Sequence, residues 1–209
     1  MKRSVKDQIE EKIRRAPKGK LYVLSDFSDI GSYATIQKTV SLMVTAGVLE
    51  QVFKGIYKKP NYNSVLQRHI PSLPSDIALA YARKNNWKIV PSGDIALNQL
   101  GLTTQVPNRY QYISSGPTRK LVLENNQEIY FKHVEVRESN LSATSSLVIE
   151  ALKAMGKEKV DEAILATIKS KLTDKQFIQL KKESIRARTW IRDLILKMEK
   201  IDVKFFSTN

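Results

Sequence analysis

Residues 32–60 read SYATIQKTVSLMVTAGVLEQVFKGIYKKP, and this segment gives the clearest indication of the fold. Ser32 is a favourable helix N-cap, and Gly47 is placed to end the helix that follows it. Between them, apolar residues recur at the spacing of one buried helix face: Ile36, Val40 and Met43. Two short strands then flank Lys54-Gly55, where glycine permits a tight turn. A helix followed by such a hairpin is the second half of a winged helix-turn-helix, which places the helix in a DNA major groove.

The residues before this stretch supply the first half of the same fold. Ser4 can cap a first helix, with Asp7 placed to complete a capping box. Residues 21–24 are a short strand candidate, and a brief helical turn runs from there to Ile30. The order helix, strand, helix, helix, strand, strand predicts a winged-helix DNA-binding domain over residues 1–60.

The outer flank of the second long helix carries the residue types that contact DNA. Glutamine can pair with adenine through two hydrogen bonds, serine and threonine can contact a base or a phosphate, and lysine contacts guanine or phosphate. We predict a DNA-binding surface formed by Ser32, Tyr33, Thr35, Gln37, Lys38, Ser41, Lys54, Gly55 and Lys58. An ordinary solvated helix face remains the alternative, and Leu42, if it points outward, leaves one polar contact fewer. Lys18 and Lys20 are either further phosphate contacts or part of a solvated loop.

The sequence of the remaining residues predicts a linker over residues 61–75 and a second domain over residues 76–209. The expected elements of that domain are a helix capped by Ser75, strands at 88–90 and 110–113, a short helix from Gly93-Asp94, a hairpin of 121–124 with 128–134, and helices near 144–155, 158–171, 174–186 and 188–199. The fold class is therefore α+β: an N-terminal winged helix-turn-helix followed by a mixed α/β domain with a helical C-terminus.

The amino-acid composition indicates which kinds of partner suit this protein. Among 209 residues, 35 lysines and arginines oppose 21 acids, which gives a net charge of +14. Such an excess favours a polyanionic partner, although it also fits a membrane surface or an acidic protein. The chain has no cysteine, no signal-peptide pattern and no apolar run long enough to span a membrane. We expect a cytoplasmic protein that uses no membrane contact.

Catalytic motifs are weak. The two histidines, His69 and His133, lie far apart in sequence and lack metal-ligand spacing. The turn Pro91-Ser92-Gly93-Asp94 could cradle a phosphate, but Asp94 as a helix N-cap explains it more simply. We therefore expect no enzyme activity, no catalytic residues, no metal and no cofactor. At the last helix, Lys181, Arg188 and Arg192 form a basic side, which Lys182 and Arg186 flank. This side is either plain surface, an extension of the DNA contact or a contact for an acidic partner.

Two segments carry a resemblance to a known family: KGKLYVLSDFSDIGSYATIQKTVSLMVTAGVLEQVFKGIYKKP (residues 18–60) and IVPSGDIALNQLGLTTQVPNRYQYISSGPTRKL (residues 89–121). In their order and spacing the chain resembles the AbiEi-type antitoxins of bacterial type IV toxin–antitoxin (abortive infection) systems, in the branch related to a DUF6088-type domain. The resemblance implies that the winged helix binds repeats in the promoter of its own operon and represses it. It also implies that the C-terminal region neutralises a nucleotidyltransferase-like toxin, classically without a stable complex.

Two rival hypotheses remain beside a DNA-binding antitoxin. One is a stand-alone winged-helix transcription regulator whose C-terminal domain senses a ligand or a protein. The other is a nucleic-acid-processing enzyme that uses residues 76–135, against which the lack of clustered acids or histidines counts.

Overall fold

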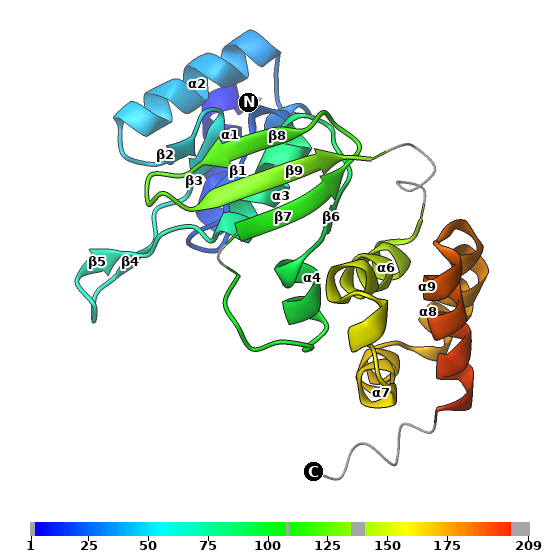
Figure 1. The fold of residues 1–209 in the computed structure, drawn as a ribbon. Coiled ribbons are helices and arrows are strands. Elements are labelled where there is room, and N and C mark those ends of the chain that lie inside the picture. Colours follow the sequence, from blue (N-terminus) through cyan, green and yellow to red (C-terminus); the bar gives the residue numbers. More distant parts are fainter. Residues whose placement is uncertain (1–2, 108, 135–140, 202–209) are drawn as a thin grey trace. The chain divides into compact units, whose positions relative to one another are not determined.

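The chain contains helices and small sheets in two compact units, residues 1–87 and 88–209 (Figure 1). The computed structural model describes residues 3–107, 109–134 and 141–201. The predicted α+β class is therefore confirmed. The predicted division into domains at residues 60–75 stays a prediction about independent folding, and each unit is described here by itself.

The first unit begins with helices around a three-stranded antiparallel sheet of strand order β1-β3-β2. Its elements are α1 (Val5–Arg15), β1 (Leu21–Tyr22), the 3₁₀ helix η1 (Leu24–Phe27), α2 (Tyr33–Thr45), β2 (Glu50–Phe53) and β3 (Ile56–Lys58). Leu24 thus begins η1 instead of ending the strand predicted for residues 21–24.

Local signals in the sequence set the ends of these elements. The Ser4 hydroxyl accepts a hydrogen bond from the Asp7 N–H, and the Asp7 carboxylate accepts one from the Ser4 N–H, so the predicted capping box forms. The Ser32 hydroxyl accepts a hydrogen bond from the Thr35 N–H and caps α2 as predicted. Gly47 and Gly55 have φ values of +72° and +74°, which only glycine adopts without strain. The helix end and the hairpin turn therefore lie where the sequence predicts them.

One hydrophobic core holds α1, α2 and the sheet together. It consists of Ile9, Ile13, Tyr22, Phe27, Ile36, Val40, Met43 and Leu49. The predicted inward side of α2 is confirmed, because Ile36, Val40 and Met43 are at most 2% exposed. This core fixes which side of α2 faces solvent.

The first unit continues past residue 60. Strands β4 (Tyr62–Asn63) and β5 (Arg68–His69) form a small hairpin within the segment that was expected to be a linker. Helix α3 (Pro74–Lys84) follows, with Leu73 at its N-cap, so the prediction that Ser75 caps this helix is wrong. Proline suits the first helical position because its missing N–H needs no partner there. The Tyr81 ring of α3 lies edge-on to that of Phe53, with 6.0 Å between ring centroids.

The second unit joins a four-stranded sheet to a group of helices. Its strands are β6 (Ile89–Pro91), β7 (Arg109–Ser114), β8 (Arg119–Val122) and β9 (Glu128–His133). Its helices are α4 (Asp94–Gln99), α6 (Ala143–Met155), η2 (Lys157–Lys159), α7 (Glu162–Ser170), α8 (Asp174–Glu183), η3 (Ser184–Arg186), α9 (Thr189–Lys197) and η4 (Met198–Lys200). The strand order is β6-β7-β9-β8, with β7 and β9 parallel and the other pairs antiparallel.

The helices of the second unit share a core centred on α6. Val148, Leu152, Ile168, Leu180, Ile191, Ile195 and Met198 are among its fully buried members. The predicted capping box between Thr173 and Gln176 forms at the start of α8. Gly93, and not Asp94, is the N-cap of α4, so that detail of the sequence analysis is wrong. No helix within the described ranges is long and apolar enough to cross a membrane.

Candidate nucleic-acid interface

Helix α2 presents a polar side to solvent, opposite its buried stripe. The predicted contact residues on it are all exposed: Ser32, Tyr33, Thr35, Gln37, Lys38 and Ser41. We call these six residues the α2 outer face. Tyr33 is 68% exposed, and Lys38 is the one charged residue of the helix. A surface with a cation and no carboxylate can approach a phosphate backbone without repulsion.

Two details limit the contacts that this face can make. The Ser32 and Thr35 hydroxyls lie 2.9 Å apart and are hydrogen-bonded to each other within the helix cap. Leu42 points outward and is 58% exposed. An outward leucine removes one polar contact but can pack against a thymine methyl group.

The β2–β3 turn holds Lys54 in an exposed position. The Lys84 ammonium of α3 donates a hydrogen bond of 2.7 Å to the Lys54 carbonyl. Gly55 has a positive φ that favours glycine, and a Cβ there would lie 2.9 Å from the flexible end of the Lys84 side chain, which would have to shift. Burial, with the neighbouring Lys54 charge, lowers the pKa of Lys84. Helix α3 thus fixes the turn that presents Lys54.

Lys58 does not lie with the other predicted residues. Its side chain is only 4% exposed and forms an ion pair of 2.9 Å with Glu50. It also donates a hydrogen bond to the Ile70 carbonyl at 3.1 Å. We therefore leave Lys58 out of the candidate surface.

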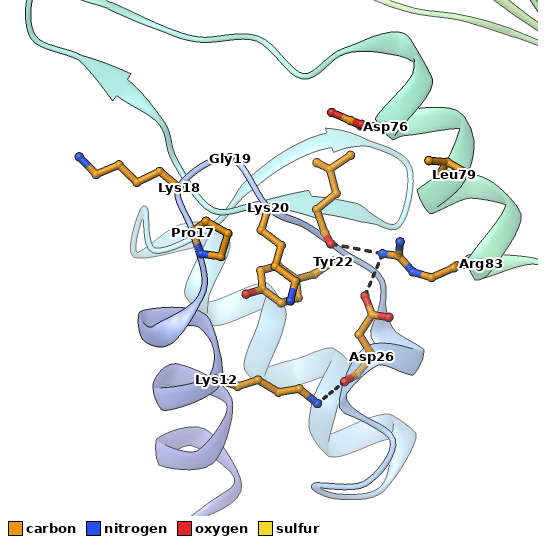
Figure 2. A pocket seen from close by; sticks show the side chains of 11 residues that line it. Lys12, Pro17, Lys18, Gly19, Lys20, Tyr22, Asp26, Asp76, Leu79 and Arg83 are labelled. Carbon is orange, nitrogen blue, oxygen red and sulfur yellow. Dashed lines mark hydrogen bonds and ion pairs between the residues drawn. The ribbon is translucent and has the colours of Figure 1, made fainter. Parts of the chain in front are cut away.

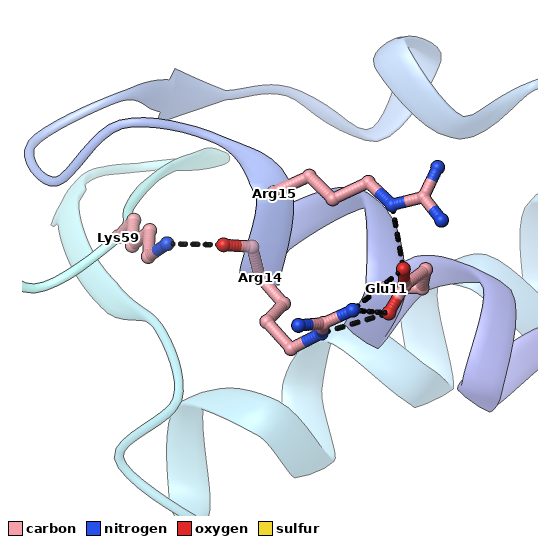
Figure 3. A network of polar contacts seen from close by, with 4 residues as sticks. All are labelled: Glu11, Arg14, Arg15 and Lys59. Carbon is pink, nitrogen blue, oxygen red and sulfur yellow. Dashed lines mark hydrogen bonds and ion pairs between the residues drawn. The ribbon is translucent and has the colours of Figure 1, made fainter.

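The Lys59 side chain is also engaged in hydrogen bonds, at the C-terminal end of α1 (Figure 3). Its ammonium donates to the carbonyls of Arg14 and Ala16 at 2.9 and 2.7 Å. Arg14 and Arg15 both form ion pairs with Glu11, at 2.8 and 2.5 Å. The hydrogen bond from Arg14, followed by that from Arg15, lowers the pKa of Glu11 despite partial desolvation. The single Glu11 carboxylate therefore offsets only part of the positive charge near the α1 end.

A cavity of about 680 Å³ lies between α1, the loop before β1 and α3 (Figure 2). The Lys12 ammonium donates to the Asp26 carbonyl at 2.6 Å, and Arg83 contacts the Asp26 carboxylate at 3.1 Å. Lys18 and Lys20 line the same cavity and are exposed, as a phosphate contact would require. Asp26 and Asp76 also line the cavity and offset part of its positive charge.

The two histidines take part in ordinary polar contacts. His69 Nδ1 lies 2.9 Å from a Glu50 carboxylate oxygen, and His133 Nδ1 lies 2.9 Å from the Gly116 carbonyl. Over the described part of the chain, no three histidine, aspartate or glutamate side chains are placed to hold a metal ion. These contacts do not form a recognisable catalytic arrangement around either histidine.

Comparison with known proteins returns a family and a distant structure. A family model described as "Family of unknown function (DUF6088)" matches residues 8–180. No curated protein matches. The crystal structure of the RV2827C protein from Mycobacterium tuberculosis is 12% identical, with 95% of this chain and 78% of that chain covered and a TM-score of 0.40.

Proposed function

The chain belongs to the DUF6088 family, whose function is unknown, and we propose that this member is a DNA-binding antitoxin of a type IV toxin–antitoxin system. In this proposal it acts in the cytoplasm without catalysis and represses its own operon by binding double-stranded DNA at promoter repeats. It also counteracts a nucleotidyltransferase-like toxin.

The exposed α2 outer face, followed directly by the Lys54 turn, is the observation that carries the DNA-binding half. The element order α1, β1, η1, α2, β2, β3 and the antiparallel sheet β1-β3-β2 are those expected of a winged helix-turn-helix. In such a fold α2 is the recognition helix and the β2–β3 hairpin is the wing. The fold therefore supports a major-groove role for α2.

Each polar residue of this surface has a role that its chemistry suits. Gln37 is the candidate for base recognition, because its amide can both donate to and accept from adenine. Lys38 on the helix and Lys54 on the turn are candidates for phosphate contacts. The antitoxin half of the proposal is supported by the resemblance of residues 18–60 and 89–121 to AbiEi-type proteins.

A mobility-shift titration with the DNA upstream of the gene tests the DNA-binding half. Replacing Lys38→Ala and Lys54→Ala together should weaken binding at every sequence. It should also reduce the slope of log affinity against log salt by about 2, one for each lost phosphate contact. The matched control is Lys157→Ala with Lys175→Ala, two exposed lysines of the second unit. Equal affinity for wild type and the Lys38/Lys54 variant would show that the DNA surface lies elsewhere.

The antitoxin half needs a separate experiment. Co-expression with a neighbouring nucleotidyltransferase-like gene, if the operon has one, should restore growth that the toxin alone prevents. Operator binding without rescue would reject the antitoxin role and leave the DNA-binding role intact.

A second candidate function is a transcription regulator whose second unit senses a ligand. A cavity of about 720 Å³ in that unit, lined by Lys132, Arg186 and Arg188, favours it. Ligand-dependent change in operator affinity, in the absence of any toxin gene, would distinguish this regulator from an antitoxin.

A further inference from the structure

The second unit contains a cavity of about 720 Å³ whose wall is rich in positive charge. Four parts of the unit meet there: the turn between β6 and α4, strands β7 and β9, helix α6, and the junction of η3 with α9. Lys132 comes from β9, Arg186 ends η3, and Arg188 is the N-cap of α9. These residues are far apart in sequence, so the cavity is a product of the fold.

Three of the cations at this cavity have no anionic partner among the described residues. Lys132, Arg186 and Arg188 are exposed, and none of the described carboxylates forms an ion pair with them. Among the residues that the structure describes, Glu150 is the carboxylate that lines the cavity; it is 8% exposed and pairs with Lys153 at 2.9 Å. Like charges gathered in one cavity repel one another, and a bound polyanion removes that repulsion.

Polar groups without charge complete the wall. Gly93 has φ +58° and ψ −140°, a conformation that is nearly restricted to glycine. A Cβ at this position would lie 2.9 Å from the Gln111 side-chain oxygen, so bare backbone lines the cavity beside that amide. Ser92 precedes Gly93, and the Ser92 N–H donates a hydrogen bond of 3.0 Å to the Gln111 carbonyl. The turn noted in the sequence as a phosphate candidate therefore lies beside the three cations.

We propose that this cavity binds the diphosphate or triphosphate group of a small molecule of nucleotide size. Guanidinium groups bind phosphate oxygens in pairs, and three unpaired cations match the charge of two or three phosphates. The volume of about 720 Å³ falls within the range of roughly 300–1,000 Å³ that is typical of small-molecule sites. A concave wall built from turns and helix ends favours a compact polyanion over a DNA duplex. The inference does not depend on the proposed DNA binding, because that binding is assigned to residues of the first unit.

Calorimetric titration of the full chain tests the site with four probes: ATP, GTP, inorganic pyrophosphate and orthophosphate. We expect one molecule of ATP, GTP or pyrophosphate to bind per chain, at least tenfold more tightly than orthophosphate. Tighter binding of a nucleotide than of pyrophosphate identifies a nucleotide as the ligand. Equal binding identifies the polyphosphate group alone. Failure of all three polyphosphate probes to bind would overturn the proposal, as would orthophosphate binding equally well.

Variants show whether binding occurs in the cavity. Replacing Arg186→Gln and Arg188→Gln together should weaken pyrophosphate binding at least tenfold, and Lys132→Gln alone should weaken it several-fold. Lys182→Gln with Arg192→Gln removes the same charge from exposed positions outside the cavity and should leave affinity unchanged. Equal loss in both double variants, with thermal melts unchanged, would mean that only net charge attracts the anion and would reject the site. Duplex DNA that binds through Arg186 and Arg188 while no nucleotide binds would also reject it.

Discussion

Lys58 lies two residues after Ile56 on β3, and both side chains are buried. Alternation along a strand places residues 56 and 58 on the same face, so the inward direction of Lys58 was available from the sequence. Lys58 was nevertheless predicted to contact DNA, on account of its charge. A lysine is rarely buried without a partner, and the partner here, Glu50, lies directly opposite on β2.

This arrangement predicts unequal effects for the two members of the ion pair. Glu50→Ala should lower the free energy of unfolding by about 2 kcal/mol, because it leaves a buried ammonium without its anion. Lys58→Met should cost only about 1 kcal/mol, since an apolar chain of similar size fills the same space. Urea denaturation of the two variants measures the difference.

The same Lys58 variant is informative about the interface. Lys58→Met should bind operator DNA as wild type does, in contrast to Lys54→Ala. Loss of DNA affinity in Lys58→Met, with its stability retained, would return Lys58 to the DNA surface and show that the buried position is not the bound one.

At the scale of elements, Glu183 of α8 joins its helix to the start of α6. Both carboxylate oxygens accept from the Ser142 N–H, at 3.2 and 3.1 Å, and one accepts from the Ser142 hydroxyl at 2.8 Å. Burial alone would raise the pKa of Glu183, but hydrogen bonds from Ser145, Gln179 and Ser142 outweigh it and lower the pKa to about 2. A carboxylate at a helix N-terminus is also favoured by the helix dipole.

A lowered pKa makes this contact dependent on pH. Because the folded pKa is about 2 and the ordinary value is 4.5, the stabilisation is complete above about pH 5 and is lost as pH falls toward 2. Glu183→Gln should therefore be about 1–2 kcal/mol less stable than wild type at pH 6, after allowance for solvent screening, and nearly equal to it at pH 2. Urea titrations across this range test the prediction. Glu158→Gln, at an exposed glutamate of η2, should show no such convergence.

Elements with local signals were predictable, and those that depend on distant residues were not. Caps at Ser4, Ser32 and Thr173 depend on side chains three residues away, so the sequence contains the whole interaction. The β4–β5 hairpin has only two residues in each strand, too few for a recognisable alternation. Strand β7 pairs in parallel with β9 and not with β8, which comes between them in sequence. No local pattern specifies this choice of partner.

The two candidate sites differ in the same way. The α2 outer face and the Lys54 turn lie within one stretch of sequence, so helical spacing and a turn glycine were enough to find them. The basic cavity brings Ser92 together with Arg188. The turn at Ser92-Gly93 and the basic side that includes Arg188 each carried a local signal, but no local pattern placed the two together.

At the scale of the whole molecule, the extent of the first unit can be tested with fragments. Helix α3 contacts the unit through the Tyr81–Phe53 ring pair, through Arg83 on the Leu21 carbonyl and through Lys84 on the Lys54 carbonyl. A fragment of residues 1–87 should therefore unfold cooperatively in urea. A fragment of residues 1–60 should be less stable by at least about 2 kcal/mol, because it loses the aromatic contact and both hydrogen bonds.

The fragment experiment also decides where a domain boundary belongs. Equal stability of the two fragments would support a winged-helix domain that ends at residue 60, as the sequence alone suggested. A stable 1–87 fragment that binds operator DNA would assign DNA binding to this unit without any contribution from residues 88–209.

The strand order β6-β7-β9-β8 has a consequence for synthesis on the ribosome. Strand β7 leaves the exit tunnel with β6 on one edge, and its other edge stays bare until residue 133 has emerged. During that interval β7 offers unpaired backbone groups to any neighbouring nascent chain. Strand β9 pairs with β8 across the turn at Asn125-Asn126 and also covers this edge of β7, so translation slowed between residues 114 and 133 would prolong the exposure of the edge.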